Sequence, residues 1–487
     1  MLSKELEAVL GAAYADFISS HNAYLDTAHI DALRATEFSR LDEQGHTYID
    51  FTGGGLYAKK QIIEHSQKLI NGVFGNPHSS NPTSVKATEV TEAARKCVLS
   101  YFNASPDEYI CVFTQNASGA LKLLGEAYPF EKDDHYLLTF DNHNSVNGIR
   151  EFARNKGAIF NYTPIRKEDL RLDAEKLMEN LDQHISGANK LFAFPAQSNV
   201  SGVKHDLEWI NIAQQKGWDV LLDAAAFVPS NKLDLSIYKP EFVAISFYKI
   251  FGYPTGLGCL LIRNTAFAKL RRPWFAGGTV SIVSVQGDGF SYDNGQAMFE
   301  DGTINYLDIP AIEIGLKHIE SIGIESIGKR IECLTDWALQ QLQSLHHDNG
   351  DRLVKIYGPQ DTTDRGGTIA MNFYDEDGDM YDFLEIEQMA NARNISLRTG
   401  CFCNPGIDET YHAFEEKELK DYFDKSGSKN YRDLIDFVGK RRGAVRISFG
   451  YISNFKDAYT YLLFAESLLN KKRAEELEHL PAAACAK

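Results

Sequence analysis

The stretch Ile245-Ser-Phe-Tyr-Lys249-Ile-Phe-Gly-Tyr-Pro-Thr-Gly-Leu-Gly258 places a lysine between an apolar run and a turn rich in glycine. The apolar neighbours of Lys249 argue against an ordinary, solvated surface lysine. A desolvated lysine has a lowered pKa, so its neutral amine can hold a carbonyl compound as a Schiff base. Ser246 lies at the end of the same run, and we predict that both side chains belong to one binding site.

Short apolar runs alternate with helical patterns on the N-terminal side of this stretch. The pattern predicts helices over 118–128 and 207–216. Strand, helix and strand in series favour right-handed crossovers and a mostly parallel sheet. Ligands of such α/β sheets bind beyond the carboxyl ends of the strands, so polar residues just after each run are the first site candidates. The predicted strands span residues 109–113, 136–140, 190–194, 219–222, 242–245 and 258–262.

A second region with a different pattern begins near Ile309. It predicts a helix over 311–345, then strands, and a last helix from 456 to about 472, which together are typical of a smaller α+β domain. The strands of this region span residues 354–357, 368–373 and 444–448. The charged stretch 408–442 is predicted to be a surface excursion.

We therefore predict three units in the chain. Residues 1–45 form an N-terminal helical segment that packs on the small domain or covers the site. Residues 46–308 form the large domain, and residues 309–487 form the small C-terminal domain that carries a cysteine loop.

Composition excludes several classes of protein. The 487 residues are 44% hydrophobic and 24% charged, as in ordinary globular proteins, and the net charge of −17 argues against nucleic acid as a main partner. Seven scattered cysteines without a CxxC pair favour reduced thiols in a cytoplasm over a disulfide framework. No apolar run approaches the roughly 18 residues of a membrane span, and residues 1–17 predict an amphipathic helix rather than a signal peptide.

The segment Thr114-Gln-Asn-Ala-Ser-Gly-Ala120 follows a predicted strand and opens a predicted helix. Small residues at a helix N-terminus let backbone N–H groups approach an anion, and the helix dipole favours negative charge. A phosphate group fits such a turn. A simple N-cap by Asn116 or Ser118 explains the same residues, and both interpretations stay open.

Three further strand ends carry polar side chains. His143 is placed to stack on an aromatic cofactor, although a solvated histidine fits its polar loop equally well. Asp223 ends a buried run and needs a partner, for which a protonated pyridine nitrogen is apt and a helix N-cap is the alternative. Asn199 occupies a comparable position and is a candidate donor to a ring oxygen.

The segment Arg398-Thr-Gly-Cys-Phe-Cys-Asn-Pro-Gly406 carries two thiols between glycine and proline residues. These flanks favour an exposed, mobile nucleophile, and the chemistry does not decide between Cys401 and Cys403. As zinc ligands the two cysteines lack companions. Arg446, on an apolar strand, and Arg398 are candidates for binding a substrate carboxylate through the guanidinium fork, with a structural salt bridge as the alternative for both.

Together these segments resemble the class V aminotransferase group of pyridoxal-phosphate enzymes over nearly the whole chain. Within that group they are most similar to the cysteine-desulfurase-like domain of molybdenum cofactor sulfurases. The segments that carry this resemblance are 246–258, 398–406 and Val445-Arg-Ile-Ser-Phe-Gly-Tyr451. The resemblance implies an α/β protein of fold type I, a homodimer, and pyridoxal 5′-phosphate as cofactor.

The resemblance also assigns roles to the candidate residues. Lys249 would hold the cofactor, His143 would stack on its ring, Asp223 would pair with the ring nitrogen, and Arg446 would bind the substrate carboxylate. Cys403 falls where desulfurases carry the thiol that forms a persulfide, and Cys401 falls on a non-nucleophilic neighbour. The phosphate would be bound by Thr114, Asn116, Ala117 and Ser246, and by Thr303 from the neighbouring subunit.

Three departures from the family pattern stand out. Ala226 replaces a usual glutamine and Tyr248 replaces a usual histidine, so proton transfer is expected to differ from that of ordinary desulfurases. The sequence ends near residue 487 without the C-terminal domain of full-length sulfurases. We therefore expect that a separate protein receives the sulfur or that the substrate differs.

The main prediction is a cysteine desulfurase-like lyase that converts L-cysteine to L-alanine and passes a persulfide from Cys403 to an acceptor. The first alternative is a pyridoxal-phosphate enzyme acting on another amino acid, such as an aminotransferase, an eliminase or a selenocysteine lyase. The second is a non-catalytic sulfur carrier or scaffold in which Cys401 and Cys403 form a metal or redox pair.

Overall fold

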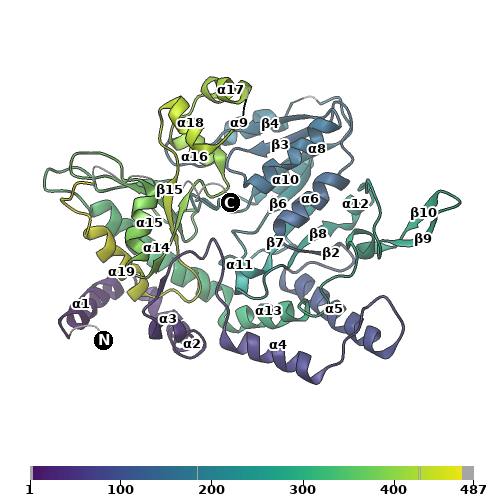
Figure 1. Cartoon of the computed structure of the whole chain (residues 1–487), viewed down its shortest axis with the longest axis horizontal. Coiled ribbons are helices and arrows are strands. Elements are labelled where there is room, and N and C mark those ends of the chain that lie inside the picture. The colour runs from purple at the N-terminus through teal and green to yellow at the C-terminus, as the bar shows by residue number, and fades with distance from the viewer. Residues whose placement is uncertain (1–3, 184, 426, 428, 474–487) are drawn as a thin grey trace.

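The computed structural model describes residues 4–473 except 184, 426 and 428 (Figure 1). Its central sheet has seven strands in the order β2-β8-β7-β6-β5-β3-β4, and only β8 runs antiparallel to its neighbours. This confirms the predicted, mostly parallel α/β sheet. The strands are β2 (Tyr109–Thr114), β3 (His135–Thr139), β4 (Ile159–Thr163), β5 (Lys190–Pro195), β6 (Asp219–Asp223), β7 (Phe242–Ser246) and β8 (Gly258–Arg263).

The prediction missed one strand of this sheet, β4. It lies at the edge beside β3, and its side chains are mostly half-exposed, so it lacks the continuous apolar run that marked the six buried strands. A strand covered on one side carries a weaker hydrophobic signal than a strand buried on both faces.

Alternating residues of the strands feed two separate cores, because successive side chains in a strand point to opposite faces. Leu222, Val243 and Ile245 belong to one core, which α4 (Lys59–Asn71), α5 (Pro82–Tyr101) and α13 (Pro310–Ile322) help to cover. Leu221 and Ala244 belong to the other core, beneath α6 (Ala117–Ala127) and α8 (Ile149–Asn155). Strong burial on both faces explains why these strands read as uninterrupted apolar runs.

A smaller antiparallel sheet has the order β11-β12-β15-β14. Its strands are β11 (Val354–Tyr357), β12 (Thr368–Phe373), β15 (Ala444–Ser448) and β14 (Arg398–Gly400). The predicted helix over 311–345 is two helices, α13 and α14 (Ile324–Ser344), since Gly323 adopts a φ of +89° between them. The last helix, α19 (Phe455–Glu466), ends before the predicted limit near 472.

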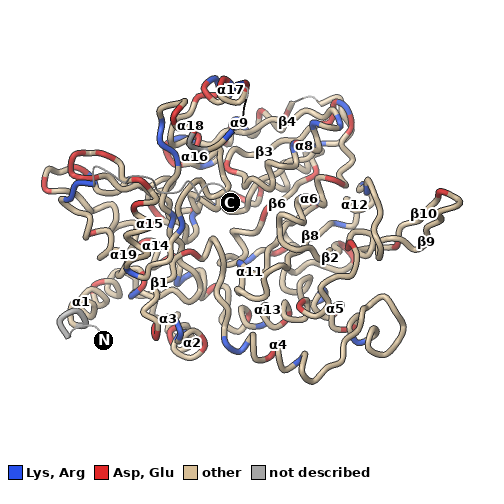
Figure 2. The backbone as a smooth tube through the Cα atoms, viewed as in Figure 1, with Lys and Arg blue, Asp and Glu red and all other residues tan. Residues whose placement is uncertain are grey.

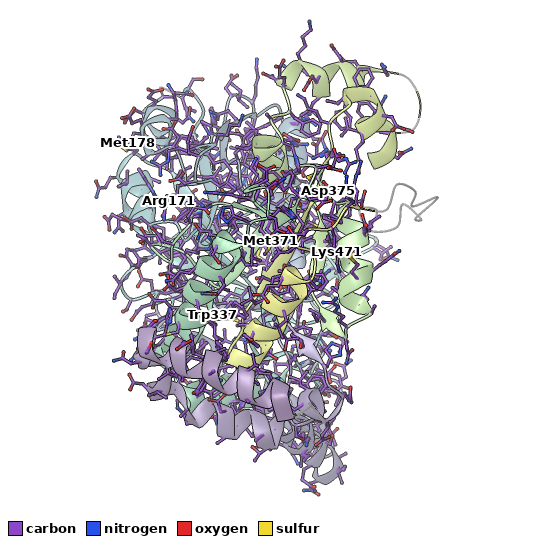
Figure 3. The ribbon with its side chains drawn as sticks, turned by 90° about the vertical axis from the view of Figure 1, so that its left-hand side faces the viewer. Arg171, Met178, Trp337, Met371, Asp375 and Lys471 are labelled. Atoms are coloured by element: carbon purple, nitrogen blue, oxygen red, sulfur yellow. The ribbon has the colours of Figure 1, made fainter. Side chains whose placement is uncertain are left out.

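The N-terminal helices pack on the helices of the smaller sheet. They are α1 (Lys4–Ser20), η1 (Asn22–Thr27), α2 (His29–Glu37) and α3 (Arg40–Glu43). Trp337 of α14 packs against Phe17 of α1 and Phe455 of α19, with ring centroids 6.2 and 4.9 Å apart (Figure 3). Arg34 forms a buried pair with Asp457, with Nη2 and Oδ1 3.0 Å apart. The domain limits at 45 and 308 stay a prediction.

The chain next runs from the N-terminal helices toward the smaller sheet. Strand β1 (Thr47–Tyr48) pairs in parallel with β13 (Ile395–Ser396), and Asp50 forms a bridge to Ser448 of β15. This pairing brings the start of the chain beside β14 and β15, which are hundreds of residues away in sequence.

The stretch 408–442 forms an excursion, as predicted, at the top of the view in Figure 1. It contains the end of α16 (Pro405–Tyr411), then α17 (Glu416–Asp424) and α18 (Tyr431–Val438). Figure 2 shows acidic and basic residues interspersed over the molecule, including this excursion. Within residues 4–473, apart from the three gaps, no helix is long and apolar enough to cross a bilayer.

The remaining elements are short helices and one hairpin. They are α7 (Asn144–Asn147), α9 (Ala174–Leu181), α10 (Glu208–Gln215), α11 (Phe247–Phe251), α12 (Asn264–Phe267), β9 (Val280–Ser284), β10 (Gly289–Tyr292), η2 (Gly295–Phe299) and α15 (Phe383–Asn391). The hairpin β9–β10 projects from the right-hand side in Figure 1.

Candidate active site

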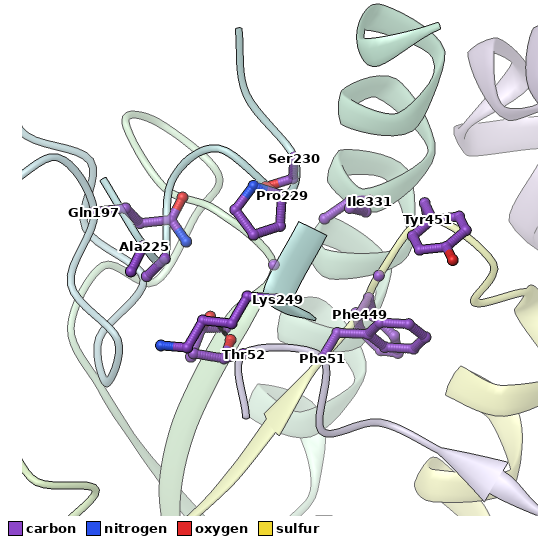
Figure 4. Close-up of a pocket in the computed structure, with 14 residues that line it drawn as sticks. Phe51, Thr52, Gln197, Ala225, Pro229, Ser230, Lys249, Ile331, Phe449 and Tyr451 are labelled. Carbon is purple, nitrogen blue, oxygen red and sulfur yellow. Dashed lines mark hydrogen bonds between the residues drawn. The ribbon is translucent and has the colours of Figure 1, made fainter. Parts of the chain in front are cut away.

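A cavity of about 650 Å³ lies where the carboxyl ends of the central strands meet the start of α6. A second cavity of about 420 Å³ adjoins it, between the two sheets (Figure 4). Both cavities share Gln197, Ala225, Ala226 and Lys249. The larger cavity is lined by the predicted residues Asn116, Ala117, His143, Asn199, Asp223, Ser246 and Lys249, and also by Ser118, Leu121, Ser145, Pro195 and Tyr248.

Lys249 lies on α11, the short helix that follows β7. Burial lowers the pKa of its ammonium group, while the Asp223 carboxylate acts in the opposite direction. Among the described residues its Nζ has no hydrogen-bond partner, so the amine is available to a ligand in the cavity. Gly252 ends α11 at a φ of +80°, and a Cβ there would lie 2.5 Å from the Tyr57 nitrogen. The lysine therefore sits on a turn that only glycine can close.

The start of α6 forms one wall of the larger cavity. Asn116 is the N-cap, because its Oδ1 accepts a hydrogen bond from the Gly119 nitrogen at 2.9 Å. Ser246 Oγ accepts from the Ala117 nitrogen at 2.9 Å and so ties β7 to this helix. The capping interpretation is therefore correct for Asn116, and the same turn faces the cavity.

Thr114 does not reach the cavity. Its hydroxyl donates to the Asn116 carbonyl at 2.9 Å, and Thr114 is not among the cavity-lining residues. Its side chain stabilises the turn that precedes α6, rather than contributing a direct contact to the cavity in this structure.

His143 and Asp223 stand on the strand ends that the sequence indicated. His143 Nδ1 accepts a hydrogen bond from the Ser145 nitrogen at 3.1 Å, so the neutral ring carries its proton on Nε2. Burial lowers the His143 pKa, and the Asp223 carboxylate opposes this shift. Asp223 is buried, and its Oδ1 accepts from the Ala225 nitrogen at 3.0 Å. The site thus combines a neutral imidazole with a buried carboxylate.

The backbone of the cysteine loop is hydrogen-bonded beside His143, which lines the cavity. The Asn144 nitrogen, next to His143, donates to the Cys403 carbonyl at 2.7 Å. The Cys403 side chain is exposed, whereas Cys401 is half-buried. Both Phe402 and Cys403 have a φ of +54°, which is uncommon for residues other than glycine. The thiol of Cys403 is therefore carried by a sharply turned backbone that is bonded to the residue next to His143.

Asparagine side chains fasten this loop. Asn404, fully buried, donates from Nδ2 to the Asp141 carbonyl at 2.7 Å and to Asn199 Oδ1 at 2.9 Å. Asn199 in turn donates to the Phe402 carbonyl at 2.8 Å. The loop is thus held by hydrogen bonds, and the Asn199 amide bonds the loop while Asn199 also lines the cavity. Its bond to a ring oxygen stays a prediction.

The two candidate arginines share one carboxylate, that of Asp50. Arg446 Nη2 donates to Asp50 Oδ1 at 2.9 Å, and Arg398 donates from Nε and Nη2 to Asp50 Oδ2 at 2.9 and 2.7 Å. The salt-bridge alternative thus describes both arginines, and neither lines the cavities. The Phe402 ring lies 4.8 Å from the Arg446 guanidinium and links the arginines to the cysteine loop.

Thr303 lies apart from these residues. It is exposed, and its hydroxyl accepts a hydrogen bond from Asn76 Nδ2 at 3.1 Å. It does not line either cavity of its own chain. In the described part of the chain, no group of three His, Cys, Asp or Glu side chains is placed to hold a metal ion.

Sequence reasoning missed three residues of the site. Asp50 follows a short strand, so its position beyond an apolar pair was a usable signal. Gln197 is buried and lines both cavities, and Asn404 fastens the cysteine loop. Gln197 precedes Asn199 by two residues at the same strand end, but nothing local to the sequence distinguishes the two amides.

Comparisons with known proteins agree with this geometry. The family model described as Aminotransferase class-V matches residues 48–459. The molybdenum cofactor sulfurase of Oryza sativa subsp. japonica is 38% identical over 475 residues, which cover 90% of this chain and 57% of the rice protein. The molybdenum cofactor sulfurase of Homo sapiens is 36% identical over 454 residues, 89% of this chain and 50% of the human protein. The chain thus spans somewhat more than half the length of these curated relatives.

Solved structures resemble the whole described fold. An apo cysteine desulfurase from Thermococcus onnurineus NA1 superposes with a TM-score of 0.74 at 23% identity, covering 90% of this chain and 97% of that one. The cysteine desulfurase CsdA (S-sulfonic acid) from Escherichia coli superposes with a TM-score of 0.70 at 20% identity, covering 90% and 99%. The likeness confirms the predicted fold-type-I architecture.

Proposed function

The chain belongs to the class-V aminotransferase family, and on that premise we propose that it is a pyridoxal-phosphate enzyme that removes sulfur from L-cysteine. One observation carries this proposal: the Lys249 amine lines the cavity, and the loop that bears the Cys403 thiol is hydrogen-bonded to Asn199, which lines the same cavity. The lysine lines the cavity, and the Cys403 carbonyl is bonded to the residue next to His143. An amine for a carbonyl group and a thiol for sulfur are the two reactive groups that this reaction needs.

The residues present fit pyridoxal 5′-phosphate. Lys249 offers an amine without a hydrogen-bond partner among the described residues, and Asp223 offers a buried carboxylate to the ring nitrogen. His143 offers a ring face, while the start of α6 and Ser246 suit the phosphate group.

The residues that line the cavity have separate roles in the proposed reaction. When bound, pyridoxal 5′-phosphate supplies an aldehyde for amino groups and a ring that withdraws electrons from the substrate α-carbon. Burial lowers the pKa of Lys249, so its Nζ releases a proton more readily than the amine of an exposed lysine does. Neutral His143 carries a proton on Nε2, and the buried Asp223 side chain would face the ring nitrogen.

The sulfur step belongs to Cys403. Its thiolate attacks the sulfur of L-cysteine, so that an S–S bond forms as the carbon–sulfur bond of the substrate breaks. The thiol and L-cysteine become a persulfide and L-alanine, and no external oxidant is required. The thiolate, rather than the thiol, is the nucleophile, so the thiol proton must leave before attack. The persulfide then passes to an acceptor.

The enzyme is proposed to work as a homodimer in a reducing compartment such as the cytoplasm. Thr303 is exposed and lies outside the cavity of its own chain, and α4 and the hairpin β9–β10 expose apolar side chains. A second copy packed on these surfaces would bring Thr303 toward the partner's phosphate site. A reducing compartment keeps Cys403 a free thiol. The acceptor is proposed to be a separate protein or cofactor.

The test is to incubate cofactor-loaded protein with L-cysteine and a reductant and to quantify alanine and sulfide. We expect equimolar products, lost in Lys249→Ala and Cys403→Ser, while Cys401→Ser serves as the matched thiol control and keeps most activity. Without reductant, mass spectrometry should find one added sulfur atom on the peptide of Cys403. A cofactor-loaded protein that forms no alanine from L-cysteine would contradict the proposal and favour another amino acid as substrate.

A further inference from the structure

The cluster of Asp50, Arg398 and Arg446 contains one carboxylate for two guanidinium groups. Each carboxylate oxygen accepts from a different arginine, Oδ1 from Arg446 at 2.9 Å and Oδ2 from Arg398 at 2.7 Å. The cluster therefore carries one surplus positive charge. Such a charge, next to a cavity that receives an amino acid, calls for an anionic partner.

Asp50 is rigidly placed in this cluster. Its backbone bridges Ser448 on β15, the strand of Arg446, and its carbonyl accepts from the Gly53 nitrogen at 3.0 Å. A Cβ on Gly53 would lie 2.7 Å from Asp50 Oδ1 and 2.8 Å from Arg398 Nη2. Any larger residue at this position would have to displace the Asp50 carboxylate or the Arg398 guanidinium. The carboxylate is thus a fixed part of the site.

The arginines retain donors that Asp50 does not use. Arg446 is only 2% exposed, and its Nη1 donates to the Asn199 carbonyl at 2.9 Å. Its Nε is buried and, among the described residues, has no hydrogen-bond partner, which is costly for a charged group. The Arg398 side chain is 53% exposed, so one side of the cluster is open.

We propose that Asp50 is a specificity-determining residue that occupies one of two carboxylate positions on the Arg398–Arg446 pair and leaves the other for the substrate. The inference rests on the proposed function and on the prediction, from the family resemblance, that Arg446 binds the substrate carboxylate. One carboxylate neutralises the cluster, whereas a second acidic group on the same ligand meets the negative charge of Asp50. The substrate class is therefore α-amino acids with one carboxylate and an uncharged side chain, such as cysteine.

The test compares binding of propionate and succinate to the cofactor-loaded protein by isothermal titration calorimetry at constant ionic strength. The wild type is expected to bind propionate more tightly than succinate. Asp50→Asn vacates one position, and its affinity for succinate is expected to rise about tenfold or more relative to propionate. Asp42→Asn is the matched control, because Asp42 also pairs with an arginine, Arg34, but away from the cavity.

Arg398→Gln provides a second test of the inference if the Asp50→Asn variant does not fold. Arg398→Gln leaves Asp50 and Arg446 as a neutral pair, so affinity for propionate is expected to fall about tenfold or more. A folded Asp50→Asn with the wild-type preference for propionate, or an Arg398→Gln that binds propionate like the wild type, would overturn the inference. Calorimetry involves no turnover, so its result is independent of the alanine assay: either proposal can fail while the other stands.

Discussion

The ammonium group of Lys249 destabilises the cofactor-free protein at neutral pH, because burial lowers its pKa below the ordinary lysine value. The folded state binds this proton less tightly than the unfolded chain does. The cost is fully present below the folded-state pKa and disappears as the pH rises toward about 10, where an unfolded lysine loses its proton. A reactive lysine is therefore maintained at the expense of stability.

Replacing Lys249 by an apolar residue should remove this destabilisation. Lys249→Met is expected to raise the free energy of unfolding of the cofactor-free protein by about 1 kcal/mol at pH 7, with the gain shrinking as the pH approaches 10. Denaturant titrations at several pH values measure it. Lys167→Met, at an exposed position, is the control and should show no such pH-dependent gain. A gain from Lys249→Met that stayed constant between pH 7 and 10 would show that added apolar contact, not the charge, is responsible.

At the scale of single elements, the cysteine loop and the start of α6 position the groups of the proposed active site. The loop joins β14 to α16 and holds Phe402 and Cys403 at positive φ with the help of Asn199 and Asn404. A conformation of this kind costs energy and persists only where surrounding contacts fix it. The position of the Cys403 thiol therefore depends on amide side chains that take no part in the chemistry.

Removing the central amide tests this dependence. Asn404→Ala leaves the Asp141 carbonyl and Asn199 Oδ1 without their donor, at a cost of about 1–3 kcal/mol. We expect faster hydrogen exchange of the loop amides and slower persulfide formation, while pyridoxal-phosphate binding stays unchanged. Asn430→Ala, at the N-cap of α18, removes a comparable side chain outside the loop and is the control. Unchanged exchange in Asn404→Ala would show that the loop does not need this fastening.

The start of α6 depends on Gly258 in the neighbouring strand β8. A Cβ at this position would lie 2.6 Å from the Asn116 carbonyl carbon and 2.7 Å from its Cα. Gly258→Ala is expected to displace the turn and to weaken pyridoxal-phosphate binding about tenfold or more, as measured by absorbance titration. Gly277→Ala is the control, because a Cβ at this position meets no atom within 4 Å, and the variant should bind pyridoxal phosphate like the wild type. Gly256→Ala is unsuitable because the φ of Gly256 is positive.

On the scale of the whole molecule, exposed apolar side chains mark the surface on which a second copy is proposed to pack. Ile70 of α4 is 74% exposed and Val285 of the hairpin β9–β10 is 97% exposed. Exposed apolar side chains are common at interaction sites. Thr303 is proposed to reach the partner's phosphate site, so assembly and cofactor binding are expected to depend on each other.

Charged substitutions test this dependence. The double variant Ile70→Asp with Val285→Asp is expected to run as a monomer in size-exclusion chromatography with light scattering, and to hold pyridoxal phosphate less tightly. Ile159→Asp, which adds a charge at an exposed position on the opposite edge of the central sheet, should leave the mass unchanged. A wild type that is itself monomeric at micromolar concentration would refute the proposed assembly.

The sequence by itself determined the parts of the molecule that depend on local pattern. Buried strands appear as apolar runs because both faces of the sheet are covered, and the polar residues that end those runs, His143, Asp223 and Lys249, line the cavity as expected. The edge strand β4 escaped prediction because it is only partly buried. The break at Gly323 was missed because apolar spacing continues across it.

Only the tertiary structure decided which side chains meet across the chain. The pairing of Asp50 with Arg398 and Arg446 joins residues that are hundreds of positions apart, and the Asn199 amide serves a loop near residue 402. Local patterns report burial and backbone geometry, which depend on near neighbours. Ion pairs and side-chain hydrogen bonds depend instead on how the two sheets and the first fifty residues are packed together, and no periodicity in the sequence records that.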